Sequence, residues 1–139
     1  MNSKAYLAIY DEQRLFSDFI HNNLERFHQY DVLFSAPSEE LLLASLTSEV
    51  KLLLIHIPIA SDRLVELVKK VLRKFGDHKL LIYTPESEIM QTVLDHHSKK
   101  VKIVSSVFGS RDFFEALQEM MPDHQNHKIS NTTKIYNQS

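Results

Sequence analysis

The segment from Val50 to Ala60, VKLLLIHIPIA, constrains the fold of this chain more than any other. Its apolar run, residues 52–55, lacks the alternation of a strand that is buried on one face, so we expect this strand to be covered on both faces. A buried helix has a similar run, but the segment is short and Pro58 closes it, which favours a strand. In an open parallel sheet, functional groups lie just beyond the carboxyl ends of the strands, and here that place belongs to His56.

Further strands and helices are predicted to alternate on both sides of this segment. Apolar runs predict strands at residues 5–10, 31–34, 79–84 and 101–104. Apolar residues at three- and four-residue spacing predict helices whose buried stripes span residues 15–27, 64–75, 89–94 and 113–121, and a further helix is predicted to carry residues 41–46. Leu15 and Ile89 are expected to face the core in two of these helices. Ser38, and either Ser61 or Asp62, are expected to be N-caps.

This alternation predicts an α/β fold with helices on both faces of a parallel sheet. Right-handed crossovers leave few topologies, and the flavodoxin-like (βα)5 doubly wound sheet with strand order 2-1-3-4-5 suits this number of units. Residues 1–121 are predicted to form one domain. Residues 122–139 are polar without an apolar stripe, which is typical of a tail or linker.

The amino-acid composition excludes several classes of function. The 139 residues carry a net charge of −2, which gives no overall footprint for nucleic acid or an anionic membrane. Cysteine is absent, which excludes disulfides and thiolate chemistry and agrees with a reducing, cytoplasmic location. The N-terminal residues predict neither a signal peptide nor a membrane anchor. With only two glycines, a glycine-rich phosphate-binding loop is excluded.

The predicted strand order brings polar residues together at one edge of the sheet. Asp11 and Glu12 follow the first strand, His56 ends the third and Thr84 ends the fourth. The fifth strand adds Ser105 or Ser106 beside them. Three segments, IYDEQRLF (residues 9–16), LLIYTPES (80–87) and SRDFFEAL (110–117), complete a recognisable pattern. From about residue 6 to 121 the chain resembles the receiver domain of bacterial two-component response regulators, in the branch that precedes a LuxR/NarL-type helix-turn-helix.

The resemblance implies what a working site at this edge contains. In such receivers an acid pair holds Mg²⁺, an aspartate after the third strand accepts the phosphoryl group, and a hydroxyl residue and a lysine bind its oxygens. Asp11 and Glu12 match the acid pair, and Thr84 matches the hydroxyl residue. The remaining positions depart from the pattern, because His56 stands in place of the aspartate and Ser106 in place of the lysine.

Each of these residues also has an ordinary structural interpretation. A single histidine at a strand end is more often a hydrogen-bonded structural residue, and we expect His56 to bond near Asp11 or Thr84. Asp11 and Glu12 are expected to bind Mg²⁺ weakly at best, because the third carboxylate of the family is missing. The pair at residues 96–97, His-His, is interpreted as surface residues, and the lysines at 99, 100 and 102 as a solvated edge.

These observations predict a degenerate receiver that is not an enzyme and uses no cofactor. It would act as a phosphorylation-independent regulatory and dimerisation module of a LuxR-type transcription regulator. A homodimer is expected through the surface between about residues 86 and 121, without a membrane partner. DNA would be bound only through a separate helix-turn-helix domain, which these residues do not contain. The alternative is a small-molecule-binding or enzymatic flavodoxin-like domain, since a fold does not fix a function.

Overall fold

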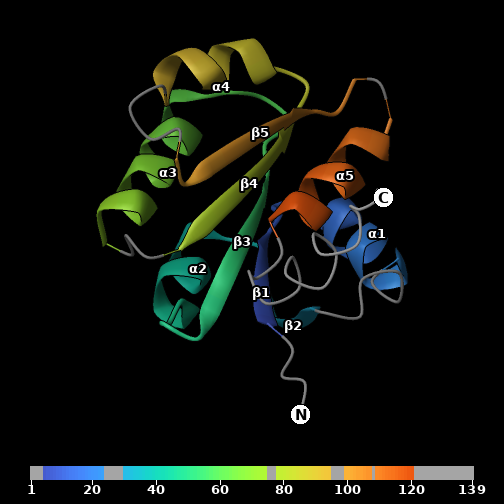
Figure 1. The fold of residues 1–139 in the computed structure, drawn as a ribbon. Coiled ribbons are helices and arrows are strands. Elements are labelled where there is room, and N and C mark those ends of the chain that lie inside the picture. Colours follow the sequence, from blue (N-terminus) through green and yellow to red (C-terminus); the bar gives the residue numbers. More distant parts are fainter. Residues whose placement is uncertain (1–4, 24–29, 75–77, 95–98, 108, 121–139) are drawn as a thin grey trace.

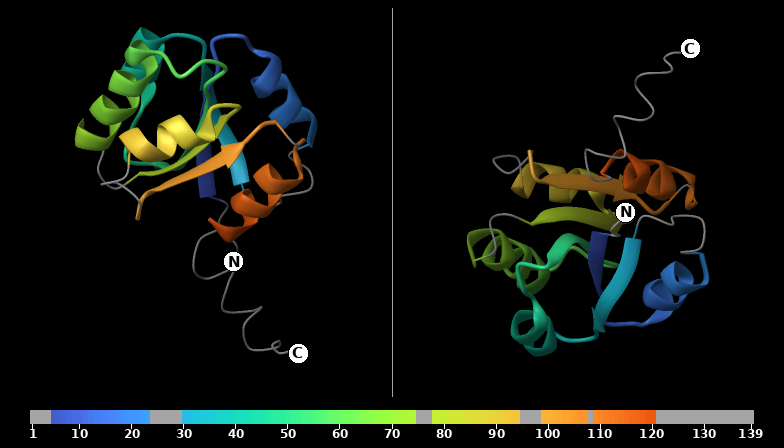
Figure 2. Two further views of the ribbon diagram at one scale, coloured as in Figure 1. Left: turned by 90° about the horizontal axis from the view of Figure 1, so that it is seen from above. Right: turned by 60° about the horizontal axis from the view of Figure 1, so that its bottom comes forward.

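The computed structural model describes residues 5–23, 30–74, 78–94, 99–107 and 109–120. Five parallel strands form one sheet in the order β2-β1-β3-β4-β5, as the sequence predicts. Figure 1 shows helices on both faces of this sheet, and Figure 2 shows the same layers from two further directions. The strands are β1 (Ala5–Tyr10), β2 (Tyr30–Ala36), β3 (Val50–His56), β4 (Lys79–Thr84) and β5 (Val101–Ser105).

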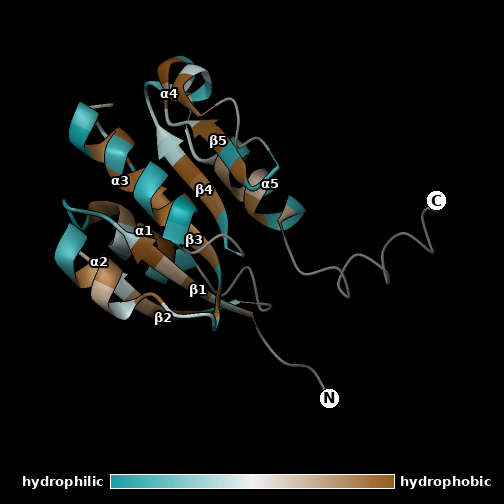
Figure 3. Cartoon of the chain, turned by 90° about the vertical axis from the view of Figure 1, so that its left-hand side faces the viewer, coloured by the Kyte–Doolittle hydropathy of each residue, from teal (hydrophilic) through white to brown (hydrophobic). Residues whose placement is uncertain are grey.

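The helices divide between the two faces of the sheet. They are α1 (Leu15–Asn23), α2 (Glu39–Ser45), α3 (Asp62–Lys74), α4 (Ser87–Val93) and α5 (Arg111–Glu119). One core cluster packs α2, α3 and α4 against the sheet, and a second packs α1 and α5 against the opposite face. Figure 3 shows the hydrophobic colouring of the strands and the hydrophilic outer positions of α3. Within the described segments, no helix has the length and apolar character needed to cross a membrane.

The central strand β3 is buried from both sides, as its unbroken apolar run predicts. Leu53 and Ile55 belong to the cluster under α2, α3 and α4, whereas Leu52 and Leu54 belong to the cluster under α1 and α5. All four side chains are at most 1% exposed. Burying each such side chain contributes about 1.5–3 kcal/mol before the entropy of ordering the chain is subtracted. This strand therefore fixes the position of His56 at its carboxyl end.

Several element boundaries differ from the sequence expectations. Strands β2 and β5 are longer than predicted, because backbone pairing with β1 and β4 recruits residues that carry no apolar signal, such as Ser35 and Ser105. Ser38 is an N-cap as expected, and its hydroxyl accepts a hydrogen bond from the Leu41 N–H. The Ser61 hydroxyl accepts the equivalent bond from the Leu64 N–H, which selects Ser61 rather than Asp62 as the cap of α3.

Two predicted core positions are wrong. Leu15 is 73% exposed because it begins α1 beside the buried face that Phe16 and Ile20 define. Ile89 is 49% exposed because Met90 is the buried residue of α4. Predicted features at residues 24, 27, 75–76, 96–97 and 121–139 lie outside the described residues.

Candidate functional site

The carboxyl edge of the sheet brings the predicted site residues to neighbouring strands. Tyr10 on β1 pairs with Ile55 on β3, so Asp11 and His56 follow adjacent positions of two hydrogen-bonded strands. His56 in turn pairs with Tyr83 on β4. The Ser106 N–H donates to the carbonyl of Thr84 at 2.9 Å, which places Ser106 at the same edge.

Both side-chain oxygens of Asp11 accept hydrogen bonds from backbone N–H groups. Its side chain is buried, with Oδ1 accepting from the Gln13 N–H at 3.1 Å and Oδ2 accepting from the Ser17 N–H at 3.0 Å. The His56 Nδ1 lies 3.2 Å from the same Oδ1, which confirms the expected contact between the two residues. This carboxylate therefore orders the turn into α1 and orients the imidazole.

The imidazole of His56 is also held by aromatic rings. It stacks on Phe16 with centroids 5.2 Å apart and an interplanar angle of 23°, and the Tyr83 ring lies 6.3 Å away. Phe16 and Tyr83 both contact Phe113 of α5, at 5.4 and 5.0 Å. These contacts support the structural interpretation of His56, because stacking and a carboxylate together fix the orientation of its ring.

Glu12 has other hydrogen-bond partners than Asp11. Its two oxygens receive two parallel hydrogen bonds from the Arg63 guanidinium of α3, at 2.7 and 2.8 Å. The Tyr10 hydroxyl donates to the same carboxylate. Burial, followed by this bond to Glu12, raises the pKa of Tyr10 to about 12, so the phenol keeps its proton and remains a donor.

Thr84 is fully buried, but its hydroxyl serves its own loop. The Oγ1 atom accepts a hydrogen bond from the Glu86 N–H at 3.1 Å. The Glu86 carboxylate reaches the loop after β3 and accepts from the Ala60 N–H. Among the described residues, the structure thus joins Asp11 with His56, whereas the side chains of Glu12 and Thr84 bond elsewhere.

The acid pair does not fit a Mg²⁺ site. Mg²⁺ requires near-octahedral oxygen ligands and usually keeps several waters, whereas Asp11 is 97% buried and all four carboxylate oxygens already accept hydrogen bonds. The Arg63 guanidinium adds a positive charge beside Glu12. In the part of the chain that the structure describes, no three His, Cys, Asp or Glu side chains form a group that could hold a metal ion.

Sequence reasoning missed Arg63, Tyr10 and Glu86. The strand order contained a signal for Arg63, because the loop after β1 and the first turn of the helix after β3 lie at the same edge of adjacent strands. An acid in one and a base in the other can therefore meet. Tyr10 and Glu86 lack such a signal, because their contacts depend on side-chain directions at the end of β1 and in the loop after β4.

A pH dependence follows from the Glu12–Arg63 pair. Hydrogen bonds from Arg63 hold the pKa of Glu12 below its ordinary value of 4.5. A carboxyl group with a lowered pKa stabilises the fold above its unfolded-state pKa, and this contribution is lost as the pH falls through the folded-state pKa. We expect Glu12→Gln to lower the free energy of unfolding at pH 7 by less than about 1 kcal/mol, because the pair is partly exposed.

Urea unfolding between about pH 3 and pH 7 measures this effect. The wild-type and Glu12→Gln curves should converge as the pH falls below the ordinary glutamate range. A difference that stays constant over the whole range would contradict the assignment of the lowered pKa to this pair.

Comparison with known proteins shows that the fold carrying this sheet edge is also present in solved structures. No protein-family model and no curated protein sequence matches the chain. Solved structures do match: the isolated REC domain of RcsB from Salmonella enterica serovar Typhimurium, with the phosphomimetic BeF3-, superposes with a TM-score of 0.70 at 16% identity. That match covers 84% of this chain and 87% of the REC domain. The chain has the receiver fold.

Two further matches give the same receiver fold. The non-phosphorylated receiver domain of RcsB from Escherichia coli has a TM-score of 0.70 at 16% identity, covering 85% of this chain and 93% of that one. A longer RcsB chain from Salmonella typhimurium has a TM-score of 0.71 at 18% identity, with 86% of this chain covered. This chain spans 60% of the length of that longer RcsB chain.

Proposed function

We propose that this receiver-fold domain is a regulatory interaction module that works without aspartyl phosphorylation, as part of a LuxR-type transcription regulator. The observation that carries the proposal is His56 at the carboxyl end of β3, oriented by Asp11 at 3.2 Å. An imidazole there supplies no carboxylate for an aspartyl phosphate, and no acidic residue occurs between Val50 and Ser61. Ser106 supplies no cation to bind a phosphoryl group.

Because the phosphoryl chemistry is missing, the function would have to come from contacts. The surface formed by α4, β5 and α5, called here the α4–β5–α5 face, supports self-association by its charges. Exposed lysines lie at and before β5, and exposed acids line α5: Lys99, Lys100, Lys102, Asp112, Glu115 and Glu119. In a two-fold symmetric pair, the basic part of one copy would meet the acidic part of the other.

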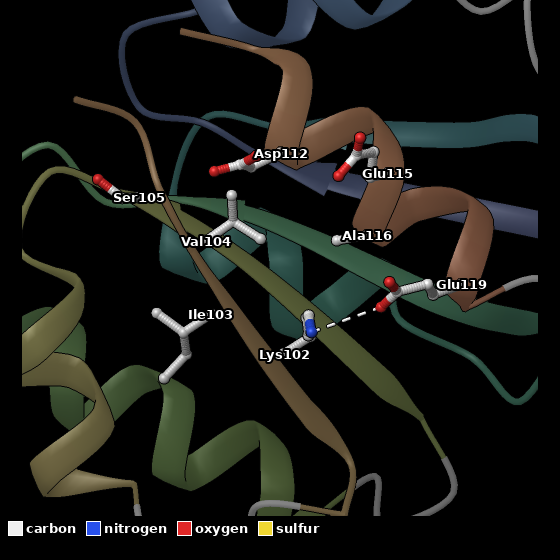
Figure 4. A pocket seen from close by; sticks show the side chains of 8 residues that line it. All are labelled: Lys102, Ile103, Val104, Ser105, Asp112, Glu115, Ala116 and Glu119. Atoms are coloured by element: carbon white, nitrogen blue, oxygen red, sulfur yellow. Dashed lines mark ion pairs between the residues drawn. The ribbon is translucent and has the colours of Figure 1, made fainter. Parts of the chain in front are cut away.

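A pocket of about 260 Å³ lies on this face between β5 and α5. Figure 4 shows Asp112 and Glu115 extending from α5 beside it, and Lys102 paired with Glu119 at 3.4 Å. β5 is an edge strand of the sheet, and no described strand pairs with its outer edge. One of the matched RcsB structures is described as two RcsB dimers bound to two parallel DNAs, which supports a dimer and a separate DNA-binding domain as the proposal for this chain.

Incubation with acetyl phosphate and Mg²⁺ tests the phosphorylation-independent part. We expect intact-protein mass spectrometry to find no acid-stable, hydroxylamine-labile adduct, because the acceptor carboxylate is absent. Beryllofluoride should leave the melting temperature unchanged. A receiver domain with an acceptor aspartate is the positive control. A Mg²⁺-dependent phosphoryl adduct mapped to Asp11 or Glu12 would refute the proposal.

A further inference from the structure

Arg63 reaches from the first turn of α3 to the loop after β1. Its Nη1 and Nη2 atoms donate to Oε2 and Oε1 of Glu12 at 2.7 and 2.8 Å. This bidentate geometry is the strongest form of a hydrogen-bonded ion pair between side chains. The Arg63 side chain is 56% exposed and the Glu12 side chain is 31% exposed. The ion pair between them therefore covers the outer side of the two acids and remains in contact with water.

The acid pair also accepts hydrogen bonds from other groups of the chain. Tyr10 donates its hydroxyl hydrogen to Oε2 of Glu12, the oxygen that also accepts from Nη1 of Arg63. Gln13 and Ser17 donate their backbone N–H groups to the two oxygens of Asp11. A divalent cation at this place would have to displace the guanidinium and break into a buried carboxylate, and would be repelled by the charge of Arg63.

We propose that Arg63 is the resident cation of this site, neutralising Glu12 in place of a divalent metal ion and connecting α3 to the loop after β1. The inference deepens the proposed phosphorylation-independent function of the same site. It describes how the two adjacent carboxylates are satisfied within the chain: Asp11 by backbone N–H groups and Glu12 by the guanidinium.

The ion pair between Glu12 and Arg63 is one of several side-chain contacts that connect neighbouring elements at this edge. The Glu86 carboxylate bonds to the Ala60 N–H, which connects the loop after β4 with the loop after β3. The Tyr83 hydroxyl donates to the carbonyl of Gly109 at 3.1 Å, which connects β4 with the loop before α5. The loops after β1, β3, β4 and β5 are thus held in one arrangement by bonds within the chain.

Mg²⁺ titration of the whole chain tests the role of Arg63. The wild-type melting temperature should not respond to Mg²⁺. Arg63→Met keeps the aliphatic stem but removes the charge, and we expect it to gain a Mg²⁺-dependent rise in melting temperature. Its Mg²⁺ affinity by calorimetry should be at least about tenfold higher than that of wild type, since repulsion between a divalent ion and a unit charge about 5 Å away exceeds this factor even in water.

Three further variants test whether the gained Mg²⁺ binding depends on the charge at residue 63, on its place beside Glu12, or only on the loss of a surface charge. Lys70→Ala is the matched control, because Lys70 lies on the same helix, has a similar exposure and pairs with Glu39 at 3.0 Å. It should not gain Mg²⁺ sensitivity. Arg63→Lys keeps the charge and should remain insensitive as well. Adding Glu12→Gln to Arg63→Met should abolish the gained binding.

Equal Mg²⁺ affinity of wild type and Arg63→Met would overturn the inference, whether both bind or neither does. Gained binding that survives Glu12→Gln would also overturn it. Neither outcome depends on phosphorylation or on the oligomeric state, so this inference and the proposed function fail by different measurements. Because Arg63 is exposed at the start of α3, its variants are expected to fold, and circular dichroism before the titration checks this.

Discussion

The Ile89→Lys variant is expected to be a monomer under conditions in which the wild-type chain is a dimer. Ile89 is the exposed large apolar residue of α4, at 49% exposure, and α4 is one of the elements that form the α4–β5–α5 face. Placing an unpaired ammonium in a buried interface costs about 3–5 kcal/mol, which weakens the association by a factor of at least about 100. Light scattering at micromolar concentration should therefore give 16.2 kDa for the variant and twice this mass for wild type.

A matched control is available in α2, which packs near the β2 edge of the sheet and not near the β5 edge. Leu41 is 51% exposed and lies in α2, which has seven residues like α4 and also carries neighbouring glutamates. Leu41→Lys makes the same chemical change outside the proposed interface, so it should leave the dimer intact. If both variants stay dimeric, the interface lies elsewhere. If wild type is strictly monomeric at high concentration, a partner of another kind replaces self-association.

The Phe113→Ala variant is expected to lose more free energy of unfolding than the Glu12→Gln and Leu15→Ala variants. Phe113 is fully buried and contacts Phe16, Tyr83 and Phe114 at centroid distances between 5.0 and 5.4 Å. Removing a buried phenyl ring costs about 3–5 kcal/mol, because the transfer energy is lost and a cavity remains. This is a large part of the 5–15 kcal/mol that typically stabilises a domain, and it should lower the melting temperature by roughly 10 °C or more.

Chemical denaturation measures this change, and Leu15→Ala serves as its control. Leu15 is 73% exposed, so its truncation should change the free energy of unfolding by less than about 0.5 kcal/mol. Because the Phe113 ring holds α5 against the rings under His56, the Phe113→Ala variant should also weaken association through α5. Equal stability of the two variants would show that the aromatic cluster does not hold α5 in place.

Much of the fold was predictable because it depends on local periodicity and on general rules of chain connection. The unbroken apolar residues of β3 predict burial on both faces, and Leu52 and Leu53 do belong to opposite core clusters. Right-handed crossovers leave few strand orders, and the flavodoxin-like order chosen among them is the one observed. The exposure of Leu15 and Ile89 was not predictable, because a stripe at three- and four-residue spacing does not fix which of two neighbouring residues faces the sheet.

The sequence by itself determined which strand ends meet at one edge of the sheet, and that Asp11 and His56 follow or end two of them. Strand ends and strand order are sufficient to bring Asp11 and His56 to one edge, and their contact at 3.2 Å agrees with that expectation. Only the tertiary structure decided which cation pairs with Glu12. Glu12 and Arg63 are 51 residues apart, and their pairing depends on the direction of α3 above the sheet and on two side-chain rotamers. Periodicity carries neither quantity, because it reports which face a residue takes and not which distant side chain it meets.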